Sequence, residues 1–324
     1  MAEPLNISAP LEAETEHVSD SDSALGDNGR SLASSTTSIN SSILKHRVEN
    51  GRTYHAYKDG KYLVPNDEGE NDRLDLQHHL FLLNYDGRLF ISPIDQKKQI
   101  HSVLDVGTGT GIWAIDFGDE FPESKVLGID ISPSQPDFVP PNVSFEIDDF
   151  EEDWTFSEKF DFIYSRMMTG ALSNWRKLFA QAFEFNTPGG YFEITDVTFP
   201  VQCNDGTVKP DSALRKWSDM ILDVSKKMQR DLDAGLSYKD EMEKVGYTDV
   251  KVRVDMWPMN RWPKGAKNKE IGMLERFTLA PFTRIYGWTP EEVEEFLVDL
   301  RKQMRNTKIH AYWNIYTVYG RKPE

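Results

Sequence analysis

Short apolar runs alternate with amphipathic helical stretches from residue 100 onwards. Each run has the length of one buried strand, and the stretches at 111–121 and 172–185 carry apolar residues at helical spacing. Strands are predicted at residues 102–106, 125–130, 143–147, 160–165 and 190–197. This alternation is typical of βαβ units, and it predicts an α/β fold with a mostly parallel sheet and helices on both faces.

The pattern continues with two further strands towards the C-terminus. These sixth and seventh strands are predicted at residues 250–257 and 312–319, and further helices at residues 211–233, 238–245, 269–279 and 290–303. The connection between the two strands is far longer than an ordinary loop, so we expect a helical insertion at residues 260–308. We expect the seventh strand to lie antiparallel beside the sixth, unlike the strands of the six-stranded dinucleotide-binding fold.

The N-terminal region differs in composition from the rest of the chain. Residues 1–44 are rich in serine, contain more acidic than basic residues and precede the first aromatic residue, Tyr54. Such a segment buries too little apolar surface to order itself, so we expect a disordered tail before a folded domain at residues 45–324. Within residues 70–83, Leu74, Leu80 and Phe81 lie at helical spacings, which predicts a helix that caps the domain.

Charge and composition narrow the class of protein. The 324 residues carry a formal net charge of -16, which disfavours direct binding of nucleic acid through general electrostatics. The sequence contains no run of 18 or more apolar residues, so it predicts no membrane-spanning helix. The first residues lack the basic start of a secretory signal. The single cysteine, Cys203, fits a reducing compartment. We therefore expect a cytoplasmic and/or nuclear protein.

A glycine-rich turn after the first predicted strand is the strongest chemical signal. It runs Asp105-Val-Gly107-Thr108-Gly109-Thr-Gly111, and its glycines allow the backbone to approach a ligand closely. Dinucleotide dehydrogenases use a similar turn, but their pattern needs a glycine where this chain has Ile112. The Asp105 carboxylate would oppose a pyrophosphate, whereas it suits the amino group of a methionine moiety. The turn therefore predicts an S-adenosyl-L-methionine site.

Residues at the ends of the next three strands complete the predicted cofactor site. Asp130, followed by Ile131, ends the second strand, where a carboxylate can accept hydrogen bonds from ribose hydroxyls. Either Asp148 or Asp149 can accept from the adenine amino group, and Phe150 can pack on the ring. Ser165, at the end of the fourth strand, is a candidate contact of the methionine portion, and the neighbouring Arg166 is equally compatible with a structural ion pair.

Several segments together resemble the fungal LaeA-like methyltransferases, a family associated with secondary metabolism. They include DRLDLQHHLF from Asp72, VLDVGTGTGIWAIDFGDEFP from Val103, GIDISPSQP from Gly128 and PGGYFEITD from Pro188. The resemblance covers roughly residues 50–320. It implies a class I methyltransferase fold, which is Rossmann-like with a seven-stranded sheet, S-adenosyl-L-methionine as cofactor and a fungal origin. Some members resemble nuclear regulators with velvet-type protein partners, and others resemble enzymes that methylate small metabolites.

No residue stands out as a catalytic base, and no histidine or cysteine spacing predicts a metal site. His78 and His79 on the capping helix are candidates for catalysis or for structural burial. Glu193 and Asp196, near the end of the fifth strand, are candidates for substrate contact. The aromatic and imidazole candidates for an acceptor pocket are Trp257, Trp262, Tyr286, Trp288 and His310.

Three functions remain in view at this point. The first is an enzyme that methylates a small-molecule metabolite or a protein acceptor. The second is a LaeA-like regulator of secondary metabolism that acts through velvet-type partners in the nucleus, with methylation secondary. The third, a nicotinamide-dependent oxidoreductase, is disfavoured by Ile112 and Asp105.

Overall fold

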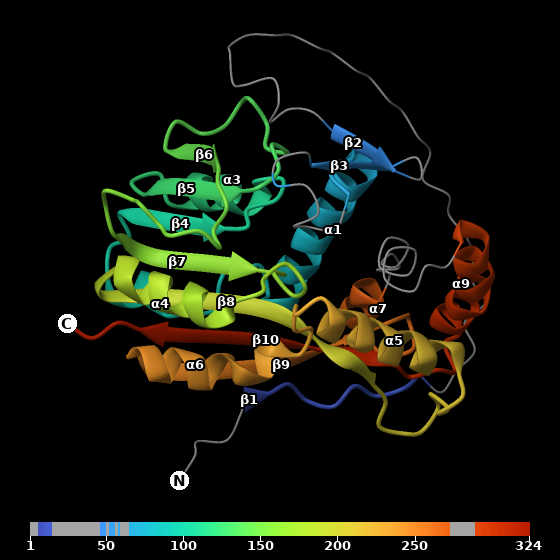
Figure 1. The fold of residues 1–324 in the computed structure, drawn as a ribbon. Coiled ribbons are helices and arrows are strands. Elements are labelled where there is room, and N and C mark those ends of the chain that lie inside the picture. The colour runs from blue at the N-terminus through green and yellow to red at the C-terminus, as the bar shows by residue number, and fades with distance from the viewer. Residues whose placement is uncertain (1–5, 15–45, 50–51, 56–57, 59–64, 273–288) are drawn as a thin grey trace.

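The computed structural model describes residues 6–14, 46–49, 52–55, 58, 65–272 and 289–324. Eight strands form one central sheet, and a separate two-stranded sheet pairs β2 (His46–Glu49) with β3 (Arg52–His55) (Figure 1). The strands of the central sheet are β1 (Asn6–Ile7), β4 (Ser102–Val106), β5 (Lys125–Asp130), β6 (Val143–Ile147), β7 (Phe160–Arg166), β8 (Asn186–Gln202), β9 (Thr248–Pro258) and β10 (Tyr312–Arg321).

The order of the strands across the central sheet is β1-β9-β10-β8-β7-β4-β5-β6. Strands β4 to β8 pair in parallel with one another, whereas β10 lies antiparallel between β8 and β9. This is the predicted arrangement, with the C-terminal strand antiparallel beside the sixth predicted strand. The predicted count of seven strands is wrong, because β1 adds an eighth strand at the β9 edge.

The segment at residues 6–14 departs from the disordered tail expected for residues 1–44. Asn6 and Ile7 pair in parallel with β9, and Ser8 N donates to the Val254 carbonyl at 2.9 Å. Farther along, Glu14 N donates to a backbone carbonyl at 3.1 Å. The physical reason is that an edge strand presents unpaired backbone groups, which an extended segment can satisfy whatever its side chains. Residues 1–5 and 15–44 lie outside the described residues.

Helices cover both faces of the sheet. On one face α4 and α6 pack, and on the other face α3 packs, with α1 beside it towards β9 and β10. The helices in chain order are α1 (Glu68–Asn84), α2 (Ile94–Lys97), α3 (Ile112–Glu120), α4 (Trp175–Phe185), α5 (Ala213–Lys227), the 3-10 helix η1 (Ala234–Ser237), α6 (Tyr238–Val245), α7 (Ala266–Ile271) and α9 (Pro290–Arg305).

Burial on both faces explains why the strands read as continuous apolar runs. Val103 and Leu104 are neighbours in β4, so their side chains point to opposite faces. Val103 packs with Trp113 and Phe117 of α3, whereas Leu104 packs in the cluster that contains Phe179 of α4. Parallel strands that are covered on both faces need apolar residues at every position.

Helix α1 is fixed to the sheet near β9 and β10. Phe81 packs against Trp257, with ring centroids 4.6 Å apart. The hydroxyl of Tyr85, just after α1, lies 2.7 Å from Thr317 Oγ1, and Asn84 donates to Asp255 at 3.0 Å. These contacts fix the C-terminal end of α1 and hold its N-terminal end over the carboxyl ends of the parallel strands.

Helices α7 and α9 lie in the connection between β9 and β10, where the sequence predicts a helical insertion. Helix α9 begins at a capping box, in which Thr289 and Glu292 bond each other's backbone N–H groups. Helix α7 begins earlier than the predicted helix at 269–279, and residues 273–288 lie outside the described residues. Helix α5 is shorter than the predicted helix at 211–233 and packs against α9.

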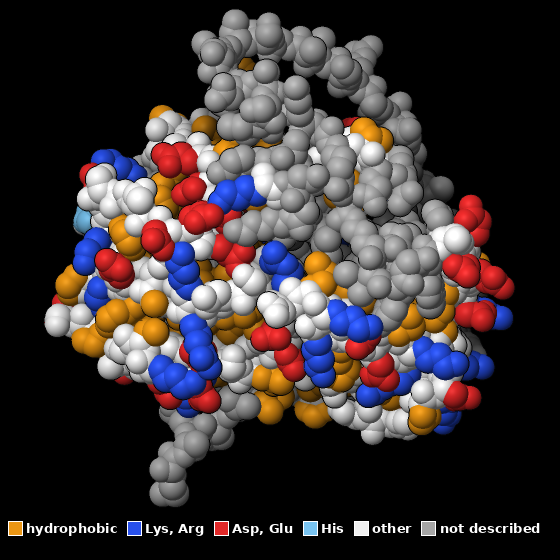
Figure 2. All heavy atoms as spheres, viewed as in Figure 1, with side chains coloured by type: hydrophobic (Ala, Val, Ile, Leu, Met, Phe, Trp, Pro, Cys, Tyr) orange, Lys and Arg blue, Asp and Glu red, His pale blue; other side chains and the backbone are white. Residues whose placement is uncertain are grey.

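Charged side chains of both signs cover the face of the molecule drawn in Figure 2. Lys and Arg side chains are interspersed with Asp and Glu side chains there. The net charge of -16 therefore does not exclude basic side chains from this face. None of the described helices is long and apolar enough to cross a membrane.

Deleting residues 1–14 should lower thermal stability without weakening the cofactor site. The deletion removes the pairing of β1 with β9 and further backbone hydrogen bonds, which join Ser8 to Val254, Glu14 to Trp262 and Lys264 to Glu12. Each contributes about 0.5–1.5 kcal/mol, partly offset by the entropy of ordering the segment. We expect the Tm to fall by about 2–6 °C in calorimetry. Deleting only residues 1–5 is the control, and an unchanged Tm after the longer deletion would contradict the observed pairing.

Candidate cofactor and acceptor site

A cavity of about 1470 Å³ opens at the carboxyl ends of the parallel strands. It runs from the glycine-rich turn to the space between α5 and α9, and α1 forms one wall. The cofactor half is the part lined by α1, by the loops after β4, β5 and β6, and by the end of β7. The acceptor half is lined mainly by Val197, Phe199, Trp217, Ile221, Val224, Met228, Trp257, Leu297, Leu300, Met304, Trp313 and Ile315.

The glycine-rich turn connects β4 to α3 and uses its own N–H groups inside the protein. Gly107 and Gly109 have positive φ, +74° and +58°, a region that favours glycine. The N–H groups of Gly107 and Thr108 both donate to the Ile129 carbonyl, at 2.9 and 3.0 Å. The N–H of Gly109 donates to Asp130 at 2.9 Å. Because these three donors are already bonded within the protein, they are not available to a pyrophosphate.

Asp105 supplies a buried negative charge at the end of β4. Its side chain lines the cavity, is 3% exposed, and accepts one hydrogen bond from Thr108 Oγ1 at 2.6 Å. It forms no ion pair with any described residue, and burial raises the pKa of this carboxyl to about 7. A buried carboxylate is costly without a cation beside it. The site therefore fits a ligand that brings an ammonium group, as the methionine portion of S-adenosyl-L-methionine does.

Asp130 and Asp149 bring two further carboxylates to the cofactor half. Asp130 accepts from the N–H groups of Gly109 and Ser132, both at 2.9 Å. A carboxylate has additional lone pairs, so Asp130 can also accept from ligand hydroxyls in the cavity. Asp149 is buried and pairs with Lys58 Nζ at 2.7 Å. Of the two acids left open by the sequence, Asp149 lines the cavity and Asp148 does not.

The predicted cofactor residues divide into two groups by position. Those that line the cavity are Asp105, Gly107, Thr108, Gly109, Asp130, Ile131, Asp149 and Phe150. Their contact with the cofactor stays a prediction, but the fold brings all of them to one wall. The three others, Gly111, Asp148 and Ser165, are not among its lining residues.

The structure shows structural roles for Gly111 and Ser165, two of the residues predicted to contact the cofactor. Gly111 begins α3 with a φ of +82°, and a Cβ there would lie 2.4 Å from the Phe145 ring. Its lack of a side chain therefore allows helix and sheet to pack closely. Ser165 is fully buried and donates to the Val106 carbonyl at 3.1 Å. Alternation along β7 turns Ser165 away from the cavity and Arg166 towards it.

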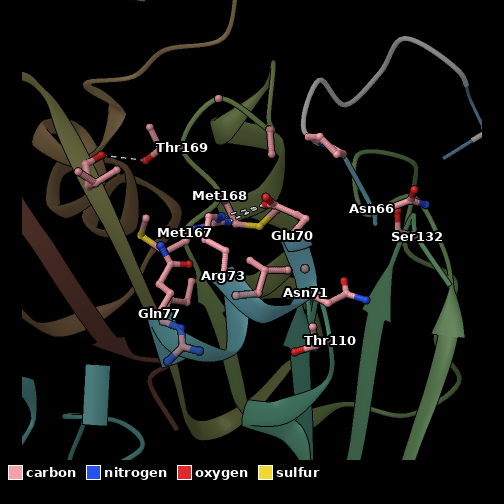
Figure 3. Close-up of a pocket in the computed structure, with 18 of the residues that line it drawn as sticks. Asn66, Glu70, Asn71, Arg73, Gln77, Thr110, Ser132, Met167, Met168 and Thr169 are labelled. Atoms are coloured by element: carbon pink, nitrogen blue, oxygen red, sulfur yellow. Dashed lines mark hydrogen bonds and ion pairs between the residues drawn. The ribbon is translucent and has the colours of Figure 1, made fainter. Parts of the chain in front are cut away.

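A row of polar side chains on α1 lines the cavity and was not singled out from the sequence. Glu70, Arg73 and Gln77 lie one turn apart on the same face, all three are buried, and Arg73 donates to Glu70 at 2.8 Å. Figure 3 shows Glu70 and Arg73 beside Met168, which follows β7. Their spacing of three and four residues is the one signal by which the sequence could have indicated this wall.

Glu193 and Asp196, the expected substrate contacts, instead hold the backbone and a buried hydroxyl. Glu193 accepts from the N–H groups of Ile91 and Ser92, at 3.0 and 2.6 Å. Asp196 accepts from Tyr238 Oη at 2.6 Å. Both are fully buried, and burial raises their pKa values to about 7 and about 6. Neither is among the residues that line the cavity.

No described histidine is among the residues that line the cavity. Both ring nitrogens of His78 are engaged, by Asp116 at 2.9 Å and by Arg166 at 3.0 Å, and burial lowers its pKa. His79 pairs with a glutamate at the surface, and His310 with an aspartate.

Of the predicted acceptor-pocket residues, Trp257 lines the cavity. Trp262 is buried elsewhere, and its indole N–H donates to the Ala311 carbonyl at 3.0 Å. Tyr286 and Trp288 lie outside the described residues.

Fold and site together define a class I S-adenosyl-L-methionine-dependent methyltransferase. The antiparallel C-terminal strand between β8 and β9 separates it from dinucleotide-binding enzymes, whose six strands are parallel. The bonded N–H groups of the turn and the buried Asp105 also favour a methyltransferase over a dinucleotide-binding enzyme. The oxidoreductase alternative therefore has no support in the structure.

The comparisons with known proteins agree with this class and give the family. A family model described as a methyltransferase domain matches residues 76–252. The chain is 36% identical to methyltransferase pytC of Aspergillus terreus, over 90% of this chain and 92% of that protein. It is 35% identical to the secondary metabolism regulator LAE1 of Cochliobolus heterostrophus, over 86% and 95%. The chain belongs to the fungal LaeA-like methyltransferases.

Two further matches illustrate the range of similar proteins. The chain is 32% identical to the protein-methionine methyltransferase laeA of Emericella nidulans, over 91% of this chain and 82% of that protein. Among solved structures it is similar to phosphoethanolamine N-methyltransferase 2 of Haemonchus contortus, at 17% identity and a TM-score of 0.42. That alignment covers 82% of this chain and 55% of the other.

Cofactor affinity should depend on pH through Asp105. Because its pKa is raised to about 7, the carboxyl is ionised above that pH and protonated below it. Only the ionised form attracts an ammonium group, so we expect the affinity for S-adenosylhomocysteine to fall about tenfold from pH 7.5 to pH 6 in calorimetric titrations. The Asp105→Asn variant should bind weakly at both pH values. The control ligand, 5′-methylthioadenosine, lacks the whole amino-acid portion, including the α-amino group, and should show no such change. An equal change for both ligands would count against this role.

Proposed function

We propose that this chain transfers a methyl group to a small, largely apolar metabolite of fungal secondary metabolism. The observation that supports this most directly is the continuity of the cavity, which joins the acidic cofactor half to an apolar half between α5 and α9. Its volume of about 1470 Å³ exceeds the ~300–1,000 Å³ typical of a pocket for one small ligand. The cavity therefore has room for a cofactor and an acceptor side by side.

The cofactor supplies an electrophilic methyl group on a sulfonium, which an acceptor atom attacks in line. The protein's part is to bind both molecules in the required orientation and to exclude water. We assign Asp105 to the amino group of the cofactor and Asp130 to its ribose hydroxyls. Asp149 and Phe150 then lie on the side of the adenine ring.

The acceptor half offers no general base among its described residues. The ionisable side chains that line this half are those of Arg230, Arg301 and Arg305. Arginine stays protonated in proteins, so none of them can accept a proton. An acceptor atom in this half must therefore be nucleophilic without help from these groups. Thioether sulfur and oxygen atoms of acidic hydroxyls meet this condition.

The names of similar proteins support a role in secondary metabolism. Relatives are named methyltransferase pytC and probable methyltransferase tdiE, and others are named secondary metabolism regulators. We extend the role of a methyltransferase in secondary metabolism to this chain. We also propose that the protein acts in the cytoplasm and/or the nucleus. A small acceptor is favoured over a protein because the lining of the acceptor half is buried between helices.

A protein acceptor is the second candidate, as part of a LaeA-like regulator with velvet-type partners in the nucleus. One relative is named a protein-methionine methyltransferase, and a methionine thioether needs no base. Incubation with methyl-labelled S-adenosylmethionine and a fungal extract separates the two candidates. Label in the organic-soluble fraction supports a small acceptor, and label confined to protein supports the alternative.

Filling the acceptor half should block transfer and spare cofactor binding. Ile221 is half-buried on α5 and lines this half, so Ile221→Trp adds volume without opening the core. We expect release of S-adenosylhomocysteine with the fungal extract to fall at least about tenfold, because a misplaced acceptor loses in-line alignment. Leu222→Trp is the matched control, since Leu222 is half-buried on the same helix and is not a lining residue. Equal activity of the two variants would contradict the assignment of this half.

A further inference from the structure

Two side chains of opposite charge line the cofactor half without pairing with each other. Asp105 lies near the end of β4 and Arg166 ends β7, which is the neighbouring parallel strand. Among the described residues, Asp105 accepts from Thr108, and the side-chain hydrogen bond of Arg166 goes to His78. Neither forms an ion pair with a described residue. The two opposite charges attract each other across the cavity without direct contact, because the positive charge of Arg166 lowers the pKa of Asp105 while burial raises it.

Arg166 is held in place by two residues of α1 that lie about one turn apart. Its Nη2 donates to His78 Nδ1 at 3.0 Å, and its guanidinium lies over the Phe81 ring, 4.6 Å from the centroid. Because arginine is always protonated, His78 Nδ1 must accept, and Nε2 then carries the hydrogen and donates to Asp116 at 2.9 Å. The two hydrogen bonds that link Asp116, His78 and Arg166 thus join α3, α1 and β7.

The other arginines at the cofactor half already have carboxylate partners. Arg52 pairs with Asp67, and Arg73 donates to Glu70 at 2.8 and 3.1 Å. A neutral imidazole and an aromatic ring hold Arg166 but leave its positive charge available to a ligand. The sequence left open a structural ion pair for Arg166, and the structure shows none among the described residues.

We propose that Arg166 binds the carboxylate of the cofactor's methionine portion and that His78 is its positioning residue. An α-amino acid carries an ammonium and a carboxylate on one carbon, and Asp105 and Arg166 present the complementary pair of charges. The bonds that fix Arg166 before binding reduce the entropy lost when it engages a carboxylate. The proposal rests on the cofactor of the family and not on the acceptor.

Two ligands that differ only in this carboxylate provide the test. S-adenosylhomocysteine carries it, and S-adenosyl-3-thiopropylamine lacks it. In calorimetric titrations of the full chain, we expect the wild type to bind S-adenosylhomocysteine about 10–100-fold more tightly, as for loss of a charge-assisted hydrogen bond. Arg166→Gln should remove most of this preference and bind S-adenosyl-3-thiopropylamine with nearly wild-type affinity, which also shows that the variant is folded.

Two further variants separate this role from general effects on the site. Arg73→Gln is the matched control, because Arg73 also lines the cavity but already pairs with Glu70; it should keep the preference. His78→Phe should reduce the preference about 3–10-fold, since Arg166 is then less well placed. Equal binding of the two ligands by wild type, a preference that survives in Arg166→Gln, or a loss in Arg73→Gln alone would overturn the proposal. Failure of the methyl-transfer assay with this preference intact would count only against the proposed acceptor.

Discussion

The buried carboxylate of Asp105 is the constraint on which the cofactor half depends. It forms no ion pair with a described residue, and burial raises its pKa to about 7, so a positive group that enters the site favours the ionised form. In the turn beside it, the Ile129 carbonyl and the Asp130 carboxylate already bind the N–H groups of Gly107, Thr108 and Gly109, so these donors are not available to an anion. The same backbone motif that binds a pyrophosphate in other α/β proteins is thereby adapted to a cationic ligand.

Helix α1 connects this charge to the rest of the molecule. Its C-terminal end is fixed to the sheet through Phe81 and Tyr85, while its polar face forms a wall of the cavity. His78 lies between these two parts and bonds both Asp116 of α3 and Arg166 of β7. Buried hydrogen bonds of this kind need every partner in place, so the helix, the glycine-rich turn and the strand ends keep one relative position.

The acceptor half follows a different physical principle. Helices α5 and α9 enclose it with apolar and tryptophan side chains, and its described charged groups are arginines. Such a lining selects an acceptor through shape and desolvation more than through proton transfer. Helix α9 belongs to the connection between β9 and β10, so this wall is carried by a different part of the chain from the strand ends that carry Asp105 and Asp130.

The sequence by itself determined the succession of strands and helices along the chain, the antiparallel last strand beside the sixth, the helices on both faces and the carboxylates at the ends of β4 and β5. These features follow from local periodicity and from the meeting of parallel strand ends at one edge. Only the tertiary structure decided which side chain of each neighbouring pair faces the cavity, as Arg166 does and Ser165 does not. It likewise turned Glu193 towards the backbone and placed residues 6–14 on the edge of β9. Those outcomes depend on which distant elements pack together, and a local pattern does not contain that information.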